Sequence, residues 1–124
     1  MILADTSVWI DHLRRPEAKM SALLNRRMVL GHPFVLGELA CGSNTNRAKL
    51  LHSLRKLPQA VPAHDDEVLD MIENHALMGI GIGFLDAHLL ASANLTQNAR
   101  FWTHDKRLAA AATRLGIAAW NALP

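Results

Sequence analysis

The sequence predicts a single α/β domain built on a mainly parallel sheet. Short apolar runs alternate with helical segments along the whole chain. This alternation is typical of folds in which helices connect parallel strands. The 124 residues suffice for one domain and leave little room for a second, so we expect one domain over residues 1–124. Half of the residues are hydrophobic and only 19% are charged, which excludes a disordered chain.

Five short apolar runs are predicted to be strands. The first opens the chain and stops at Asp5, and the fourth stops shortly before Asp105. In a parallel sheet, ligands collect at the carboxyl ends of the strands, so both acids are expected at that edge. The five runs are 1–4, 28–31, 60–62, 100–103 and 117–119.

Seven segments have the character of helices. Pro33 suits the first turn of the third helix, and Pro58 ends the fourth. Acids are crowded at the start of the fifth, where the helix dipole favours negative charge. The predicted helices are 6–14, 17–27, 33–42, 46–57, 64–77, 84–95 and 106–115.

Cysteine content and hydropathy narrow the class of protein. Cys41 is the only cysteine, which excludes an intrachain disulfide and zinc sites of two or four cysteines. No apolar run approaches the roughly 18 residues that span a bilayer. The chain opens without the basic start of a signal peptide, so we expect a cytoplasmic protein with no membrane partner.

Three acids lie in strongly apolar segments. Asp5 follows the first strand, Glu38 lies inside the third helix, and Asp86 lies near the start of the sixth. A buried carboxylate is costly unless it is paired or bound to a metal, and no lysine or arginine lies near these three in sequence. With Asp105, they would form a cluster of oxygen ligands that selects Mg²⁺ or Mn²⁺. The other seven acids are expected to be solvated or to lie near helix starts: Asp11, Glu17, Asp65, Asp66, Glu67, Asp70 and Glu73.

A simpler interpretation of these acids is helix capping. Asp5, Asp86 and Asp105 each stand at or near the start of a helix, where an aspartate oxygen accepts backbone N–H bonds. Glu38 has no such explanation because it falls in the middle of a helix. Both interpretations stay open at this point.

The distribution of charge depends on the same four acids. The chain carries 13 basic and 11 acidic residues. If four acids face a metal, the remaining surface is strongly basic and attracts a polyanion. If they do not, the protein is a mildly basic soluble domain.

Four segments in order resemble the PIN-domain family, and within it the VapC-type toxins of bacterial toxin–antitoxin pairs. The likeness covers essentially the whole chain, and the four together are far more specific than any one alone. They are Ile-Leu-Ala-Asp-Thr-Ser-Val-Trp-Ile-Asp at 2–11, Gly-Glu-Leu at 37–39, Gly-Phe-Leu-Asp-Ala-His-Leu-Leu-Ala at 83–91 and Phe-Trp-Thr-His-Asp-Lys-Arg-Leu at 101–108.

The resemblance implies a PIN-like three-layer fold with a five-stranded parallel sheet flanked by helices. It also implies a Mg²⁺-dependent (or Mn²⁺-dependent) endoribonuclease, inhibition by a cognate VapB-like antitoxin, and a homodimer. RNA would be hydrolysed by metal-activated water, leaving 5′-phosphate and 3′-hydroxyl ends. Asp5 and Asp86 become the expected direct ligands, completed by Glu38 and Asp105, directly or through water.

Residues around the four acids are assigned supporting roles. Thr103 matches a hydroxyl position that the family often keeps two residues before the last acid, and Ser7 is a second candidate for supporting the ligands. Lys106 and Arg107 are candidate RNA-phosphate contacts because they adjoin Asp105.

Other motifs favour structural roles. His88 and His104 lie close to the acids, but structural roles are favoured, and no zinc motif is present. Trp9, Trp102 and Trp120 are expected in the core or a dimer contact rather than stacked on bases. Gly79, Gly81 and Gly83 predict a flexible loop, since residue 84 is Phe and no P-loop lysine follows.

Two further function classes stay open beside the nuclease. A non-catalytic α/β binding or regulatory module would use the acids only as caps. A receiver-like phosphotransfer domain would need a neighbouring Asp pair with a well-placed lysine, or an Asp-x-Asp start, and Asp5-Thr6-Ser7 lacks the latter.

Overall fold

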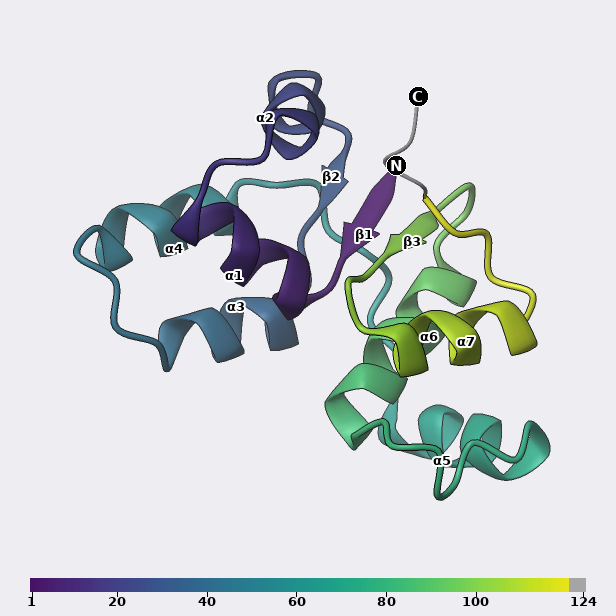
Figure 1. The fold of residues 1–124 in the computed structure, drawn as a ribbon. Helices are drawn as coiled ribbons and strands as arrows, with labels where there is room; N and C mark the ends of the chain where they lie inside the picture. The colour runs from purple at the N-terminus through teal and green to yellow at the C-terminus, as the bar shows by residue number, and fades with distance from the viewer. Residues whose placement is uncertain (121–124) are drawn as a thin grey trace.

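A small parallel sheet lies at the centre of the computed structural model, which describes residues 1–120. Its strands are β1 (Ile2–Ala4), β2 (Val29–Leu30) and β3 (Arg100–Trp102), in the order β2-β1-β3. Leu3 is opposite Leu30 on one side and opposite Phe101 on the other. β1 is therefore the middle strand, and its carboxyl end lies beside that of β3 (Figure 1).

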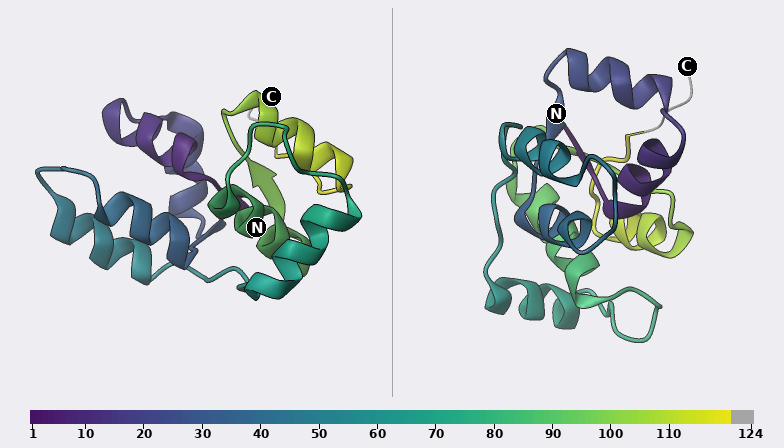
Figure 2. Two further views of the ribbon diagram at one scale, coloured as in Figure 1. Left: turned by 90° about the horizontal axis from the view of Figure 1, so that it is seen from below. Right: turned by 90° about the vertical axis from the view of Figure 1, so that its left-hand side faces the viewer.

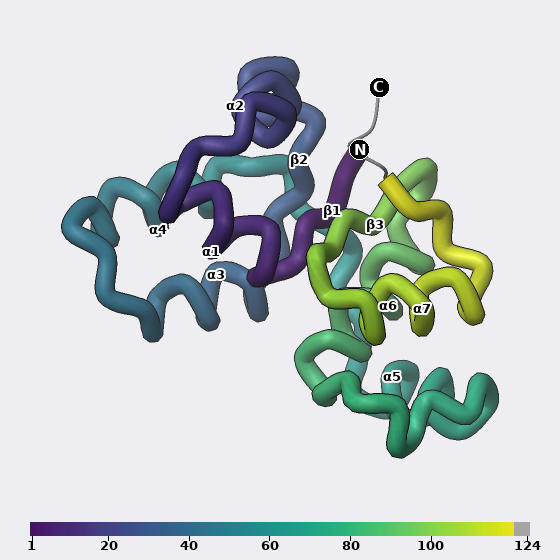
Figure 3. The backbone as a smooth tube through the Cα atoms, in the orientation of Figure 1, coloured from purple at the N-terminus to yellow at the C-terminus, as the bar shows by residue number. Residues whose placement is uncertain are grey.

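Seven helices are described in residues 1–120, in the order that the sequence predicts. Helices α1 to α4 lie to one side of the strands and α5 to α7 to the other (Figures 1 and 2). Figure 3 shows β1 running between the two groups. The helices are α1 (Thr6–Arg14), α2 (Ala18–Asn25), α3 (Pro33–Ala40), α4 (Arg47–Arg55), α5 (Asp65–Asn74), α6 (Phe84–Leu95) and α7 (Lys106–Arg114).

The prediction of five strands is wrong in the described residues, which contain three. The expected strands at 60–62 and 117–119 are replaced by single parallel bridges, Gly31 to Gln59 and Phe101 to Ala119. Proline has no N–H to donate, and the first of these segments lies between Pro58 and Pro62. The N–H of Val61, the residue before Pro62, donates to the Thr96 hydroxyl at 2.9 Å instead of to a neighbouring strand.

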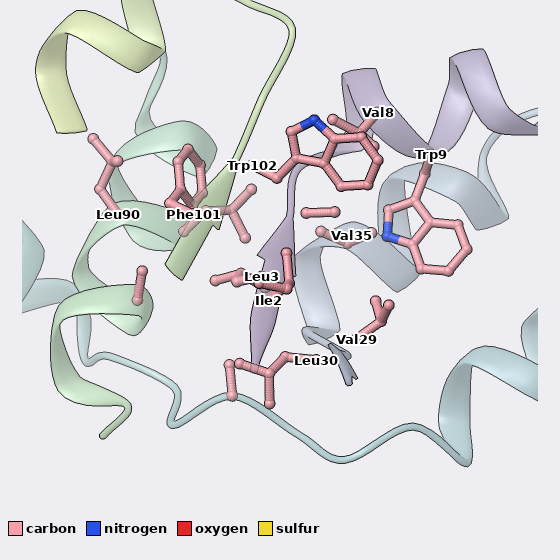
Figure 4. Packing of buried hydrophobic residues seen from close by; sticks show 14 of the residues in the cluster. Ile2, Leu3, Val8, Trp9, Val29, Leu30, Val35, Leu90, Phe101 and Trp102 are labelled. Carbon is pink, nitrogen blue, oxygen red and sulfur yellow. The ribbon is translucent and has the colours of Figure 1, made fainter. Parts of the chain in front are cut away.

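The core forms around β1 and packs helices from both sides against it. Leu3 is fully buried, and Leu90 from α6 and Phe101 from β3 lie on the same side of β1 in Figure 4. Trp9 and Trp102 are also core residues, as expected, and the Trp102 ring packs 4.4 Å from the Trp120 ring. Burial of large apolar side chains contributes roughly 1.5–3 kcal/mol each, so this cluster fixes β1 and β3 against each other.

No helix in the described part of the chain has both the length and the apolar character needed to cross a membrane.

Candidate active site

Asp5 is a buried carboxylate at the carboxyl end of β1. Its side chain is only 3% exposed. Oδ1 accepts hydrogen bonds from the Ser7 hydroxyl at 2.6 Å and from the Val8 N–H at 3.2 Å. Oδ2 accepts a hydrogen bond from the Thr103 hydroxyl at 2.5 Å. Asp5 is thus the N-cap of α1, and both of its oxygens are held by hydroxyl groups from two separate segments.

The hydroxyl groups of Ser7 and Thr103 also hold the chain that leads to Asp105. The Asp105 N–H donates to the Thr103 oxygen at 3.0 Å, and the His104 N–H donates to the Ser7 oxygen at 3.1 Å. These bonds form because Ala4 and Trp102 are opposite each other in the parallel sheet, so both chains leave at one edge. The structure therefore places Asp5 and Asp105 at the same edge of the sheet.

Asp105 and Asp86 each have one oxygen in a helix-capping contact. Asp105 Oδ1 accepts hydrogen bonds from the N–H groups of Arg107 and Leu108, at 2.9 and 3.4 Å, and caps α7. Asp86 Oδ2 accepts one from the Gly83 N–H at 3.3 Å, just before α6. Within residues 1–120, the second oxygen of each carboxylate makes no hydrogen bond. Capping and ligand binding are therefore compatible in both residues.

The pKa values of Glu38 and Asp86 are both raised, in part by the charges of other acids of the candidate site. Partial burial raises the pKa of Glu38, the nearby Thr6 hydroxyl opposes this, and the negative charges of Asp86 and Asp5 raise it further. Burial raises the pKa of Asp86, the Gly83 N–H opposes this, and the charges of Asp5 and Asp105 raise it further. Carboxylates affect one another in this way only when they lie close together. Each of the four acids is therefore near at least one other.

The expectation that Glu38 is buried is wrong, because its side chain is exposed. The buried residues of α3 are Val35 and Leu39, which are four positions apart and face the core, and Glu38 lies off that face. Asp86 is half-buried. The argument from the cost of a buried carboxylate therefore applies fully only to Asp5.

The donor chemistry of this cluster fits a hard divalent cation. Within residues 1–120, no lysine or arginine forms a salt bridge with any of the four carboxylates, so the chain does not neutralise them itself. The Thr6 hydroxyl is buried without a hydrogen-bond partner in the same part of the chain, although it is near enough to Glu38 to lower that pKa. All-oxygen donor sets of this kind suit Mg²⁺ or Mn²⁺.

The carboxylates are not arranged as a preformed chelate. In the described residues, no three Asp, Glu, His or Cys side chains lie close enough together to hold a metal ion without adjustment. Any cation bound here requires side-chain rotation, which is feasible for Glu38 because it is exposed and forms no cap. A cavity of about 300 Å³ opens beside Glu38, lined also by Leu39, Ile10 and Arg14.

The two histidines near the acids are both engaged by other carboxylates. His88 is buried, and its Nε2 lies 2.8 Å from an oxygen of Asp65. His104 Nδ1 lies 2.5 Å from an oxygen of Asp11. Sequence reasoning missed both pairs because the partners are 23 and 93 positions apart. Asp11 and Asp65 are thus more than solvated helix acids.

The candidate RNA contacts are exposed at the start of α7. Lys106 and Arg107 directly follow Asp105 at the start of α7, and both residues are exposed. The structure also places Thr103 and Ser7 on Asp5 itself, through their hydroxyl groups.

Comparison with known families identifies this arrangement. Residues 2–114 match the PIN domain. The chain belongs to the PIN-domain family. The family resemblance of the four acid-bearing segments is confirmed by this match, which spans most of the chain. Two curated relatives show the VapC type. Both are Ribonuclease VapC32 of Mycobacterium tuberculosis, one from strain CDC 1551 / Oshkosh and one from strain ATCC 25618 / H37Rv. Each is 46% identical over 118 residues, which cover 95% of this PIN-domain chain and 95% of the relative.

Proposed function

We propose that this PIN-domain protein is a Mg²⁺-dependent or Mn²⁺-dependent endoribonuclease, acting as the toxin of a toxin–antitoxin pair. The observation that carries the proposal is that Asp5, Glu38, Asp86 and Asp105 lie near one another and that no lysine or arginine of residues 1–120 forms a salt bridge with them. The curated relatives are named ribonucleases, and the identity to them covers almost the whole chain. The single domain spans residues 1–124 and acts in the cytoplasm.

The four carboxylates have different roles in binding the ion. Asp5 and Asp86 are the direct ligands, and Glu38 and Asp105 complete the set directly or through water. Thr103 and Ser7 hold the Asp5 carboxylate in one orientation, so that it presents fixed oxygens to the ion. The helix caps fix Asp105 and Asp86 in the same way.

Hydrolysis requires a nucleophile and an RNA phosphate bound next to it. When bound, a divalent cation supplies the Lewis acidity that lowers the pKa of a water towards neutrality. The site needs no side-chain nucleophile, and the products carry 5′-phosphate and 3′-hydroxyl ends. Lys106 and Arg107 contact the RNA backbone beside the acids, because cations at the rim offset the repulsion between carboxylates and phosphates.

Two kinds of protein partner belong to this proposal. The first is a VapB-like antitoxin that inhibits the toxin, and the second is another copy of the chain in a homodimer.

The experiment that tests the proposal is cleavage of labelled single-stranded RNA by the purified protein. Cleavage is expected with Mg²⁺ or Mn²⁺ and absent with EDTA. Asp5→Asn and Asp86→Asn are expected to lose it, whereas Asp70→Asn, on the exposed surface of α5, retains it. If both site variants cut as well as the parent, the nuclease assignment is wrong.

One alternative keeps some support in the structure. Asp5 and Asp105 do cap helices, as a non-catalytic binding module would require. That module gives no reason for Glu38, which caps nothing, to lie beside Asp86 and Asp5. It predicts that the protein has no metal affinity and cleaves no RNA.

A further inference from the structure

The loop before α6 contains two glycines in the left-handed region of backbone space. Gly79 has φ +71° and Gly81 has φ +89°. Both positions favour glycine because other residues are strained there. Both glycines therefore have a positive φ.

The surroundings of the two glycines differ. A Cβ atom built on Gly79 would have no atom within 4 Å. A Cβ built on Gly81 would lie 2.7 Å from Cδ and 2.8 Å from Nη1 of Arg107. The Arg107 side chain therefore lies directly against the backbone of Gly81, and a Cβ at residue 81 would force that side chain to shift.

The guanidinium of Arg107 makes no polar contact with the described residues. Within residues 1–120 it forms no salt bridge and donates no hydrogen bond to the chain. Other arginines are used: Arg47 Nε donates to the Ala40 carbonyl, and Arg114 Nη1 donates to the Ala76 carbonyl. Arg107 thus packs against Gly81, and its hydrogen-bond donors remain available to a ligand.

Each partner of this contact is in a segment whose backbone binds one acid of the site. The backbone N–H of Arg107 binds Asp105, at 2.9 Å. Two residues after Gly81, the N–H of Gly83 binds Asp86. The Gly81–Arg107 contact therefore joins the two segments that carry Asp86 and Asp105, and the guanidinium forms a salt bridge with neither carboxylate in the described residues.

We propose that Gly81 is a positioning residue that seats the Arg107 guanidinium at the rim of the acidic cluster, where it holds an RNA phosphate next to the one that is cleaved. The inference rests on the proposed ribonuclease function and adds a role for the glycine loop. A planar guanidinium suits this task because it can bind two phosphate oxygens at once. Positioning the guanidinium before RNA binds reduces the conformational entropy that this long side chain loses on binding.

The test measures RNA binding in EDTA, so that no RNA is cut. The probe is a short fluorescein-labelled single-stranded RNA, followed by anisotropy over a range of salt concentrations. Arg107→Ala is expected to weaken binding roughly three- to tenfold. It should also reduce the slope of log K against log salt by about 0.7, the value for one phosphate contact on a single strand.

Gly81→Ala is expected to reproduce most of that loss, and Gly79→Ala, which also replaces a glycine of positive φ, is expected to leave binding unchanged. In the Arg107→Ala background, Gly81→Ala should have no further effect, because the group it positions is gone. Unfolding midpoints of both glycine variants show whether their folds are equally perturbed. A loss of stability alone does not change the salt slope.

Failure of the Gly81 role can be told apart from failure of the proposed ribonuclease function. If the parent cleaves RNA with Mg²⁺ but Gly81→Ala binds RNA as the parent does, the positioning role is wrong and the nuclease remains. An equal loss in Gly79→Ala, or an undiminished Gly81→Ala effect without Arg107, also overturns it. If the parent neither binds nor cuts RNA, the proposed function and this inference fall together.

Discussion

The Thr103 hydroxyl donates a hydrogen bond to Asp5 Oδ2 across 98 positions of sequence. The same hydroxyl accepts the N–H of Asp105, so one side chain links two acids of the candidate site. The bond exists because β1 and β3 are parallel neighbours that end together. Thr103 therefore couples the orientation of Asp5 to the path of the chain into α7.

Thr103→Val should weaken both the fold and the reaction. The substitution keeps the shape but leaves Asp5 Oδ2 without its hydroxyl donor, which costs about 2 kcal/mol for a hydrogen bond to a charged group. Urea unfolding measures the loss, and RNA cleavage is expected to fall with it. Thr103→Ser should restore most of both, and Thr113→Val, on the exposed surface of α7, should change neither. Unchanged cleavage in a folded Thr103→Val would show that this bond does not orient a catalytic group.

Divalent cations should stabilise the protein. An ion that binds only the folded state adds about 2.7 kcal/mol at a concentration one hundred times its Kd. Thermal unfolding with added Mg²⁺ or Mn²⁺ is expected to move to higher temperature, and excess EDTA should reverse it. Asp5→Asn should abolish the shift, whereas Asp70→Asn should keep it. A parent protein whose unfolding ignores both ions would contradict the metal site.

Neutralising one acid should stabilise the metal-free protein. The pKa of Asp86 is raised by burial and by its neighbours, so its charged form disfavours folding. This penalty is absent below the usual pKa of 3.8 and is complete once the pH exceeds the raised folded value. In EDTA at neutral pH, Asp86→Asn should gain less than about 1 kcal/mol, because the site is partly solvated. The gain should vanish in acid, and an equal gain at every pH would point to a cause other than charge.

Glu38→Gln should behave similarly, with a smaller effect. The pKa of Glu38 is raised by partial burial, and also by the charges of Asp86 and Asp5. Since its side chain is exposed, solvent screens most of this repulsion. Denaturant unfolding in EDTA should therefore rank the metal-free variants as Asp86→Asn, then Glu38→Gln, then the parent. With saturating Mg²⁺, the ranking should reverse, because each variant has lost an oxygen ligand.

His32 should make the protein sensitive to mild acid. Burial, with a smaller effect of His88, lowers its pKa from 6.5 to about 4. As the pH falls from 6.5 the unfolded state takes up the proton first, so stability present above 6.5 is lost progressively down to about 4. The loss is at most about 3 kcal/mol. His32→Asn, which can still cap α3, should flatten the pH profile of urea unfolding over that range. A profile as steep as the parent's would assign the acid sensitivity to other groups.

Local sequence signals predicted the helices well. The predicted bounds of α1 and α6 agree with the structure to the residue. The cap contacts at these starts are local: Asp5 accepts the Val8 N–H before α1, and Asp86 accepts the Gly83 N–H before α6. Strands at 60–62 and 117–119 were wrongly predicted, because apolar character alone does not show whether neighbouring N–H groups are available for a ladder.

The sequence singled out the residues of the candidate site, but it did not predict how their side chains are arranged. The four acids stood out by their apolar surroundings, yet Glu38 proved exposed. Within a short helix, an apolar neighbourhood does not tell which side faces the core, since that depends on what packs against Val35 and Leu39.

The sequence by itself determined the order of the helices and the family to which the chain belongs, and it singled out the four acids as candidates. Only the tertiary structure decided that Thr103 and Ser7 hold Asp5, that His104 pairs with Asp11, and that Arg107 lies on Gly81. The reason is physical: helix caps and periodicity arise from residues a few positions apart, whereas these contacts depend on the parallel alignment of strands that the chain joins through most of its length.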